Sequence, residues 1–136
     1  MLVVLCGYVE SQPDTEYAVG MSYNDGMIVS SIATGGIVGG AWNAEGQTIT
    51  IKGCRNTGII QCNHQFNGGI LGGTYAMFDS TSTDTSKNIV LNSYSTGNIE
   101  SSVPNQICAR YAEVVNCYYV GGRPNVSGYG KGYLSL

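Results

Sequence analysis

The sequence has little charge: six Lys and Arg, nine Asp and Glu and a single histidine among 136 residues, for a formal net charge of −3. Proteins that bind nucleic acids use clustered basic side chains to neutralise phosphates, and the six basic residues here are spread along the chain. No apolar run approaches the roughly 20 residues that a membrane-spanning helix needs. We therefore expect neither a nucleic-acid partner nor insertion into a membrane.

The first nine residues are apolar but too few for a signal peptide, and no positively charged segment precedes them. We predict a β-strand over residues 2–9 and no signal peptide in this chain. Three origins stay open on this basis: an intracellular protein, a virion component or an excised fragment.

Strong helix formers are also scarce, whereas the chain has 20 glycines, many of them inside its apolar runs. Hydrophobic residues make up 43% of the sequence, which is too high for a disordered segment. Short β-strands separated by turns fit this composition best, and the predicted fold class is all-β.

Two strings recur in the same order, which indicates a repeated structural unit. Gly35–Gly40 and Gly68–Gly73 are nearly identical and lie 33 residues apart. Each is followed by a second shared string, at residues 50–58 and 90–97. Weaker copies are found at Asn105–Ala109 for the first string, at Ile28–Gly35 and Val114–Gly121 for the second, and over Val19–Gly26. Such periods are typical of solenoids, propellers or arrays, and four units are expected, roughly at 18–35, 36–58, 69–97 and 106–121.

Each unit is expected to hold two short strands, with the double glycines permitting positive φ and close backbone approach. The equivalent residues Ile51, Val90 and Val114 are predicted apolar anchors, which stacked units would bury in a continuous core. The variable segments 41–48, 59–67, 74–88 and 100–105 are predicted loops that leave the same edge of each coil.

The order Gly-Gly-Ile-Val-Gly, loop, Ile-x-Asn-Cys/Ser-Tyr-x-Thr-Gly resembles the GLUG repeat family over about residues 18–122. Residues 36–58 and 69–97 match well, but Gly53 stands where Asn is expected and Asn105-Gln106-Ile107 replaces the third Gly-Gly-Ile. The resemblance implies a right-handed parallel β-helix of the kind found in large surface and secreted proteins. It implies a scaffold, adhesion or presentation role and no catalytic residues.

The predicted fold is therefore a short right-handed parallel β-helix (β-solenoid) of about four coils with capping ends. Its handedness rests on the resemblance and on the general rule for parallel crossovers. We expect an N-terminal strand or cap at 1–17, repeats at 18–122 and a Gly/Tyr-rich tail or cap at 123–136. Pro124 and repeated glycines break the repeat in this tail.

The five cysteines are an odd number, which argues against a complete set of disulfides. Cys54 and Cys117 are assigned to one repeat position, with Ser93 and Ser31 in the other copies. Two coils apart, the two cysteines would be separated by roughly 9–10 Å at a strand spacing of ~4.8 Å, beyond disulfide reach. We expect them to be buried and reduced.

No set of residues predicts catalysis. His64 lies near Cys62, but without an orienting carboxylate a capping or exposed loop histidine is favoured over a nucleophilic pair. The acidic residues do not recur at one repeat position, as paired carboxylates of a glycosidase would. Asp79 and Asp84 flank a Ser/Thr-rich loop without an EF-hand pattern. We expect no cofactor and no metal.

Tyrosines are the main candidates for binding. Tyr94 and Tyr118 are assigned to one repeat position, with Arg55 and Ile32 in the other copies. Stacked aromatic rings could hold sugar rings or a partner protein, or could simply stabilise a sheet face. Trp42 follows a double glycine at the start of a variable segment, where an exposed ring would be a contact residue. The candidate partner-binding residues are Trp42, Tyr75, Tyr94, Tyr118 and Tyr119.

These patterns predict a non-enzymatic structural protein that joins other proteins in a larger particle or surface layer, such as a virion shell. The first alternative is an adhesin-like module that binds glycans or a host protein through its loops and tyrosines. A polysaccharide-degrading enzyme is the third hypothesis.

Overall fold

A computed structural model describes residues 6–10, 17–31, 33–42, 48–63, 66–74, 87–108 and 112–120. Within these ranges the chain forms β-strands and no helix, and every pairing between two strands is parallel. The strands are β1 (Cys6–Glu10), β2 (Tyr17–Gly20), β3 (Tyr23–Asn24), β4 (Ile28–Ser30), β5 (Thr34–Gly35), β6 (Val38–Trp42), β7 (Thr48–Lys52), β8 (Arg55–Asn56), β9 (Ile60–Cys62), β10 (Asn67–Gly68), β11 (Leu71–Thr74), β12 (Lys87–Leu91), β13 (Tyr94–Ser95), β14 (Ile99–Glu100), β15 (Ala112–Val115) and β16 (Tyr118–Tyr119).

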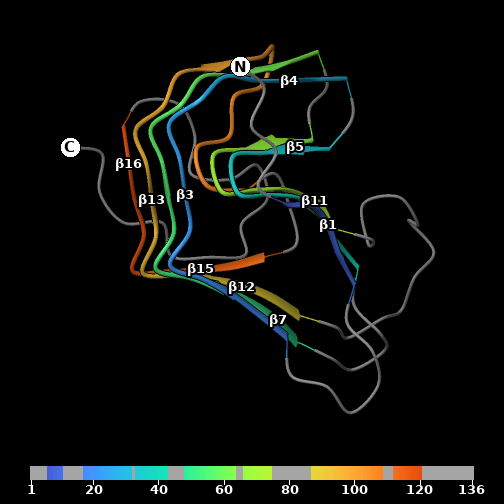
Figure 1. Cartoon of the computed structure of the whole chain (residues 1–136), viewed down its shortest axis with the longest axis vertical. Helices are drawn as coiled ribbons and strands as arrows, with labels where there is room; N and C mark the ends of the chain where they lie inside the picture. Colours follow the sequence, from blue (N-terminus) through green and yellow to red (C-terminus); the bar gives the residue numbers. More distant parts are fainter. Residues whose placement is uncertain are drawn as a thin grey trace.

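The strands form five parallel sheets, with the orders β15-β12-β7-β2, β16-β13-β8-β3, β14-β9-β4, β10-β5 and β1-β6-β11. Apart from β1, which pairs with β6, neighbouring strands in each sheet come from successive stretches of chain, which we call passes: 17–42, 48–74, 87–108 and 112–120. In Figure 1, β3, β13 and β16 run side by side along one side of the molecule, and β7, β12 and β15 lie together along another. The fold class is thus all-β with parallel strands in register, an arrangement compatible with a β-helix.

The register confirms most of the repeat read from the sequence. Val38 pairs with Leu71 and Gly40 with Gly73, so the two glycine-rich strings lie side by side. A further parallel bridge joins Leu71 to Cys108, as expected for the worn third copy at Asn105–Ala109. In the second string, Val90 pairs with both Ile51 and Val114.

One predicted equivalence is wrong. The partner of Ile51 in the first pass is Val19, and the partners of Arg55 and Asn56 are Tyr23 and Asn24. The first copy of the second string is therefore Val19–Gly26, and not Ile28–Gly35. Both stretches have an apolar residue seven positions before a glycine, so aligning on the terminal glycine could not separate them.

Two further expectations need correction. The first two passes each contain five strands and not two, because strands of two residues at the corners carry no periodic sequence signal. The segment 59–67 is not a variable loop, since β9 and the start of β10 lie in it and β9 pairs with β4 and β14. The predicted loop at 100–105 likewise overlaps a strand, because its first residue, Glu100, belongs to β14. The segments 41–48 and 74–88 do join equivalent strands, β6 to β7 and β11 to β12, but their central residues lie outside the described ranges.

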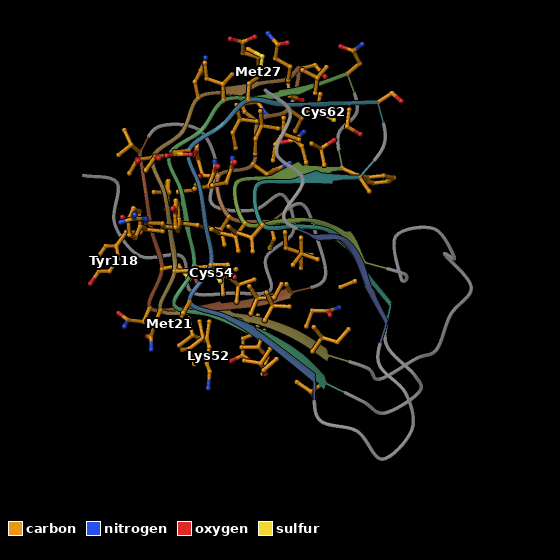
Figure 2. All side chains as sticks on the ribbon, viewed as in Figure 1. Met21, Met27, Lys52, Cys54, Cys62 and Tyr118 are labelled. Carbon is orange, nitrogen blue, oxygen red and sulfur yellow. The ribbon has the colours of Figure 1, made fainter. Side chains whose placement is uncertain are left out.

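The core lies in the space that the sheets enclose, where equivalent apolar side chains stack from pass to pass (Figure 2). Ile51, Val90 and Val114 have no exposed surface, and the partly buried Val19 packs against them. β7 alternates between buried and more exposed residues, because successive side chains of a strand point to opposite faces. The apolar-anchor prediction is confirmed for these three residues.

The double glycines allow the backbones of neighbouring passes to approach closely, and they are not needed for positive φ. Among the glycines of the described residues, only Gly53 has a positive φ, at 64°. A Cβ on Gly36 would instead run into the carbonyl oxygen of Gly69 and the side chain of Asn56. A Cβ on Gly69 would likewise run into the side chain of Ser95. These positions are restricted to glycine because the facing pass leaves no room.

One corner of every pass has a left-handed backbone. The equivalent residues Met21, Gly53, Asn92 and Asn116 have φ values of 52°, 64°, 50° and 50°. Glycine and asparagine adopt this conformation readily, whereas methionine does not. The amide of Asn116 also donates to Oδ1 of Asn92 at 2.7 Å. Gly53 thus replaces asparagine at a corner where both residues are accommodated.

Replacing Met21 by asparagine is expected to raise the free energy of unfolding by about 1 kcal/mol, because asparagine adopts the positive φ of this corner at a lower conformational cost than methionine. Met21 is 86% exposed, so little apolar contact is lost with its side chain. Urea unfolding of the two proteins measures the change. Met27→Asn is the matched control, because Met27 is also exposed but its φ is not positive. An equal effect of both substitutions would contradict the explanation.

Candidate functional site

The outer face of the sheet β16-β13-β8-β3 carries a column of four large side chains at one register position. Tyr23 pairs with Arg55, Arg55 with Tyr94, and Tyr94 with Tyr118. Tyr23 is 55% exposed and Tyr118 41% exposed. Figure 2 shows Tyr118 pointing away from the enclosed core, opposite in direction to Cys54. We call these four residues the tyrosine column.

Within the column, Arg55 lies over an aromatic ring. Its guanidinium carbon is 4.8 Å from the centroid of the Tyr23 ring, a cation–π contact between the first and second passes. The contact orients both side chains on the outer face and leaves the two tyrosines of the later passes, Tyr94 and Tyr118, next to each other.

A depression of about 280 Å³ lies at the later end of this column. Its lining residues are Tyr94, Thr96, Tyr118, Tyr119 and Val120. Ligand pockets of proteins usually span about 300–1,000 Å³, so this depression is just below the usual size and could take no more than one sugar ring or one side chain of a partner. The surface that faces the depression is apolar, and the aromatic rings provide its flat parts.

The structure brings three of the five predicted partner-binding residues together: Tyr94, Tyr118 and Tyr119 all line the depression. Trp42 ends β6, which belongs to the different sheet β1-β6-β11, so it is not part of this group. The side chain of Trp42 and the whole of Tyr75 lie outside the described residues. Thr96 and Val120 line the depression but were not predicted.

Sequence reasoning also placed the wrong residue at the head of the column. Tyr23 occupies the position assigned to Ile32, a residue outside the described ranges, because Val19–Gly26 is the true first copy. A spacing of 32 residues links Tyr23 to Arg55 and also Asn24 to Asn56. The shared asparagine was the signal that would have identified the first copy.

Behind the tyrosine column, on the inner face, polar side chains form a buried ladder. The amide of Asn24 donates to Oδ1 of Asn56 at 2.8 Å, and the amide of Asn56 donates to Oγ of Ser95 at 3.5 Å. The Ser95 hydroxyl in turn donates to Oε1 of Gln106 at 3.4 Å. All four side chains are buried. Buried polar groups need such partners, and this ladder fixes the register of the passes that display the tyrosines.

The same ladder shapes the corner after β3. The amide of Asn24 donates to the carbonyl of Gly26 at 3.1 Å, and the backbone N–H of Gly26 donates to Oδ1 of Asn24 at 3.1 Å. Asn24-Asp25-Gly26 is therefore a corner between two parallel sheets, closed by the asparagine side chain.

The predicted small-residue column is present. The backbone N–H of Cys54 donates to Oγ of Ser93 at 3.1 Å, and Cys54, Ser93 and Cys117 are all buried. Ser22 takes the place assigned to Ser31 in the first pass. Both cysteines are free thiols. Desolvation by burial raises the pKa of the Cys54 and Cys117 thiols, which keeps them neutral.

This pKa shift predicts a loss of stability in alkaline solution. Below the unfolded pKa of about 8.5 the thiol is protonated in both states, and its full contribution to the stability of the folded protein is present. As pH rises above this value, the thiol ionises more readily in the unfolded state, so this contribution is lost. The free energy of unfolding in urea is expected to fall between pH 7.5 and pH 9.5. The double variant Cys54→Ser/Cys117→Ser should fall by less, since serine already occupies this position at Ser93 and does not titrate. An equal fall in both proteins would contradict the prediction.

The other chemistry-bearing residues singled out in the sequence lie outside the described ranges. These are His64 and the loop with Asp79 and Asp84. Among the described residues, no group of three or more His, Cys, Asp or Glu is arranged to hold a metal ion. The described part of the chain also contains no helix long and apolar enough to span a membrane.

Comparison with known proteins gives no match of significance: no family model, no curated protein and no solved structure is similar to this chain.

Proposed function

We propose that the chain is a short right-handed parallel β-solenoid of about four coils, and that it acts as a rigid structural module of a larger assembly. In this proposal each GLUG-like repeat of the sequence forms one of the stacked coils. The module joins other proteins of a particle or surface layer through its outer face and its ends.

The observation that carries the proposal is the stacking of equivalent residues. Apolar residues share one register position in all four passes, the glycine-rich strings of the first two passes are paired, and the outer column holds tyrosine in three passes and Arg55 in the other. Backbone hydrogen bonds then run between passes in every sheet, along with the buried side-chain ladder. Such quasi-one-dimensional structures resist bending and present extended surfaces, which suits a spacer or shell component.

Native mass spectrometry of the chain isolated from its source tests this function. A complex in which the chain has a fixed stoichiometry with other proteins is the expected result, and its composition names the neighbours. A free monomer in the native extract would overturn the assembly role.

A second function is favoured by one observation, the depression between Tyr94, Tyr118 and Tyr119. Aromatic side chains that flank a hollow of this size suit the apolar face of a sugar ring. In this alternative the chain is an adhesin-like module that binds glycans, and the stacked passes hold the tyrosines in place.

For this alternative, Tyr118→Ala is expected to weaken binding to a glycan array hit by about tenfold, equivalent to about 1.4 kcal/mol. Circular dichroism should show an unchanged fold, because the Tyr118 side chain is exposed. Tyr23→Ala is the matched control: it removes a tyrosine from the same column but outside the depression. Equal affinity of the wild type and Tyr118→Ala would exclude the glycan site.

A further inference from the structure

The two ends of the stacked passes have complementary steps. At one end, β2, β3 and β4 are the outermost strands of their sheets, whereas β1 lies one layer further out, on β6. At the other end, β15 and β16 are outermost, one layer beyond β14. A second copy placed end to end would therefore bring its β1 into the layer that β15 and β16 of the first copy begin.

Backbone groups at these ends also match. In the tyrosine-column sheet, amides of one pass donate to carbonyls of the preceding pass, in the series Arg55 to Ser22, Tyr94 to Cys54 and Tyr118 to Ser93, at 3.0, 2.9 and 3.0 Å. By the same pattern the N–H of Tyr23 points outward at one end and the carbonyl of Cys117 points outward at the other. The described residues contain no strand beyond β3 or β16 to receive them.

Two more series predict two more hydrogen bonds across such a junction. In one series, the N–H groups of Thr57, Thr96 and Val120 donate to the carbonyls of Asn24, Asn56 and Ser95, respectively. It leaves the N–H of Asp25 and the carbonyl of Tyr119 facing outward. In the other series the direction is reversed: the N–H groups of Met21, Gly53 and Asn92 donate to the carbonyls of Lys52, Leu91 and Val115 in the following pass, respectively. It leaves the N–H of Asn116 and the carbonyl of Gly20 facing outward. Donors at each end thus face acceptors at the other.

Within residues 17–31, the edge of the first pass carries little of the charge that natural proteins place on open edges. Natural proteins discourage pairing at open edges with Lys, Pro or inward-pointing charges. Residues 17–31 contain no Lys, Arg or Pro and a single charged residue, Asp25. Instead, Met21, Met27 and Val29 are exposed there, at 86%, 41% and 56% of their surface.

We propose that the chain associates with a second copy of itself, head to tail, by stacking β2 and β3 of one copy on β15 and β16 of the next. The proposal rests on the assembly role proposed above and names one partner for it. A second copy fits because it repeats the donors, acceptors and side-chain columns in the register that each edge requires. Tyr23 of one copy then follows Tyr118 of the other, so the tyrosine column continues across the junction. A head-to-tail contact that does not close into a ring generates a filament.

Cysteine cross-linking of the full chain tests the contact. In adjacent parallel strands the Cα atoms lie about 4.8 Å apart, within the range that a disulfide can join. On mild oxidation, a mixture of Tyr23→Cys and Tyr118→Cys chains is expected to give cross-linked dimers containing one chain of each kind. The doubly substituted chain should give a ladder of longer oligomers on a non-reducing gel.

Control variants distinguish the head-to-tail contact from a symmetric contact and from non-specific cross-linking. Ile59→Cys, an exposed position in the second pass, is expected to stay uncross-linked, and the wild type gives the background from the native cysteines. Sedimentation velocity of the wild type should show a mass that rises with concentration. Efficient cross-linking of Tyr23→Cys with itself would overturn the head-to-tail arrangement, because it requires a symmetric contact.

The two proposals can fail separately. Complexes with other proteins in the native extract, together with a wild type that stays monomeric alone and gives no mixed cross-link, would overturn self-stacking but keep the assembly role. A monomer in both experiments would overturn both.

Discussion

Gly72→Ala is expected to lower the free energy of unfolding by about 3 kcal/mol, at the upper end of the usual cost of overpacking a core. Gly72 lies in β11, and a Cβ there would come within 2.5 Å of the carbonyl carbon of Thr34 and 2.6 Å of the carbonyl oxygen of Gly39. These are backbone atoms of the first pass, which cannot move aside as the end of a flexible side chain can. The passes would have to separate locally, with loss of inter-pass hydrogen bonds.

Gly20→Ala is the matched control for this prediction. A Cβ on Gly20 would lie 3.7 Å from the carbonyl oxygen of Lys52, an ordinary van der Waals contact. Urea unfolding followed by circular dichroism measures both variants, and Gly20→Ala should change stability by less than about 0.5 kcal/mol. Equal losses would show that glycine is needed in these strands for a reason other than close approach.

Ile51→Ala is expected to lower the free energy of unfolding by about 2–5 kcal/mol. The Ile51 side chain has no exposed surface and stacks between Val19 and Val90 in the core. Removing three carbon atoms leaves a cavity that the stacked neighbours cannot fill, because inter-pass hydrogen bonds hold the strands at fixed spacing.

The same substitution at Ile59 provides the comparison, since Ile59 is 37% exposed in the same pass. Its loss should be below about 1.5 kcal/mol, given the smaller area that is removed from contact. Thermal unfolding of both variants, followed at the same heating rate, gives the ranking. A smaller loss at Ile51 than at Ile59 would contradict the placement of the core.

Identical strings allowed the parallel stacking to be predicted, because a stack places like residues side by side. The glycine-rich strings and the Val90 anchor are paired as expected. The first pass was misaligned because Val19–Gly26 shares only the asparagine and the final glycine with the second pass. Tertiary pairing decided its place, and the sequence offered two apolar candidates at the same distance from a glycine.

The candidate site was predictable only in part, for a similar reason. Tyr94 and Tyr118 share a sequence context, Asn-Ser/Cys-Tyr, which marks them as equivalent. Thr96 and Val120 follow them on the next outward positions, where the residues of the passes differ and no pattern marks a binding surface. The cation–π contact of Arg55 with Tyr23 depends on the correct alignment of the first pass.

Equivalent residues of successive passes are separated by unequal lengths of chain: 32 residues from Val19 to Ile51, 39 from Ile51 to Val90 and 24 from Val90 to Val114. The register nevertheless stays constant in every sheet. Of the seven extra residues in the second spacing, six lie where β11 leads to β12, at the corner where β6 leads to β7, and one lies between β9 and β10. Loop closure costs only about 0.6 kcal/mol for each doubling of loop length. We therefore expect this corner to accept inserted peptides without a shift of the core.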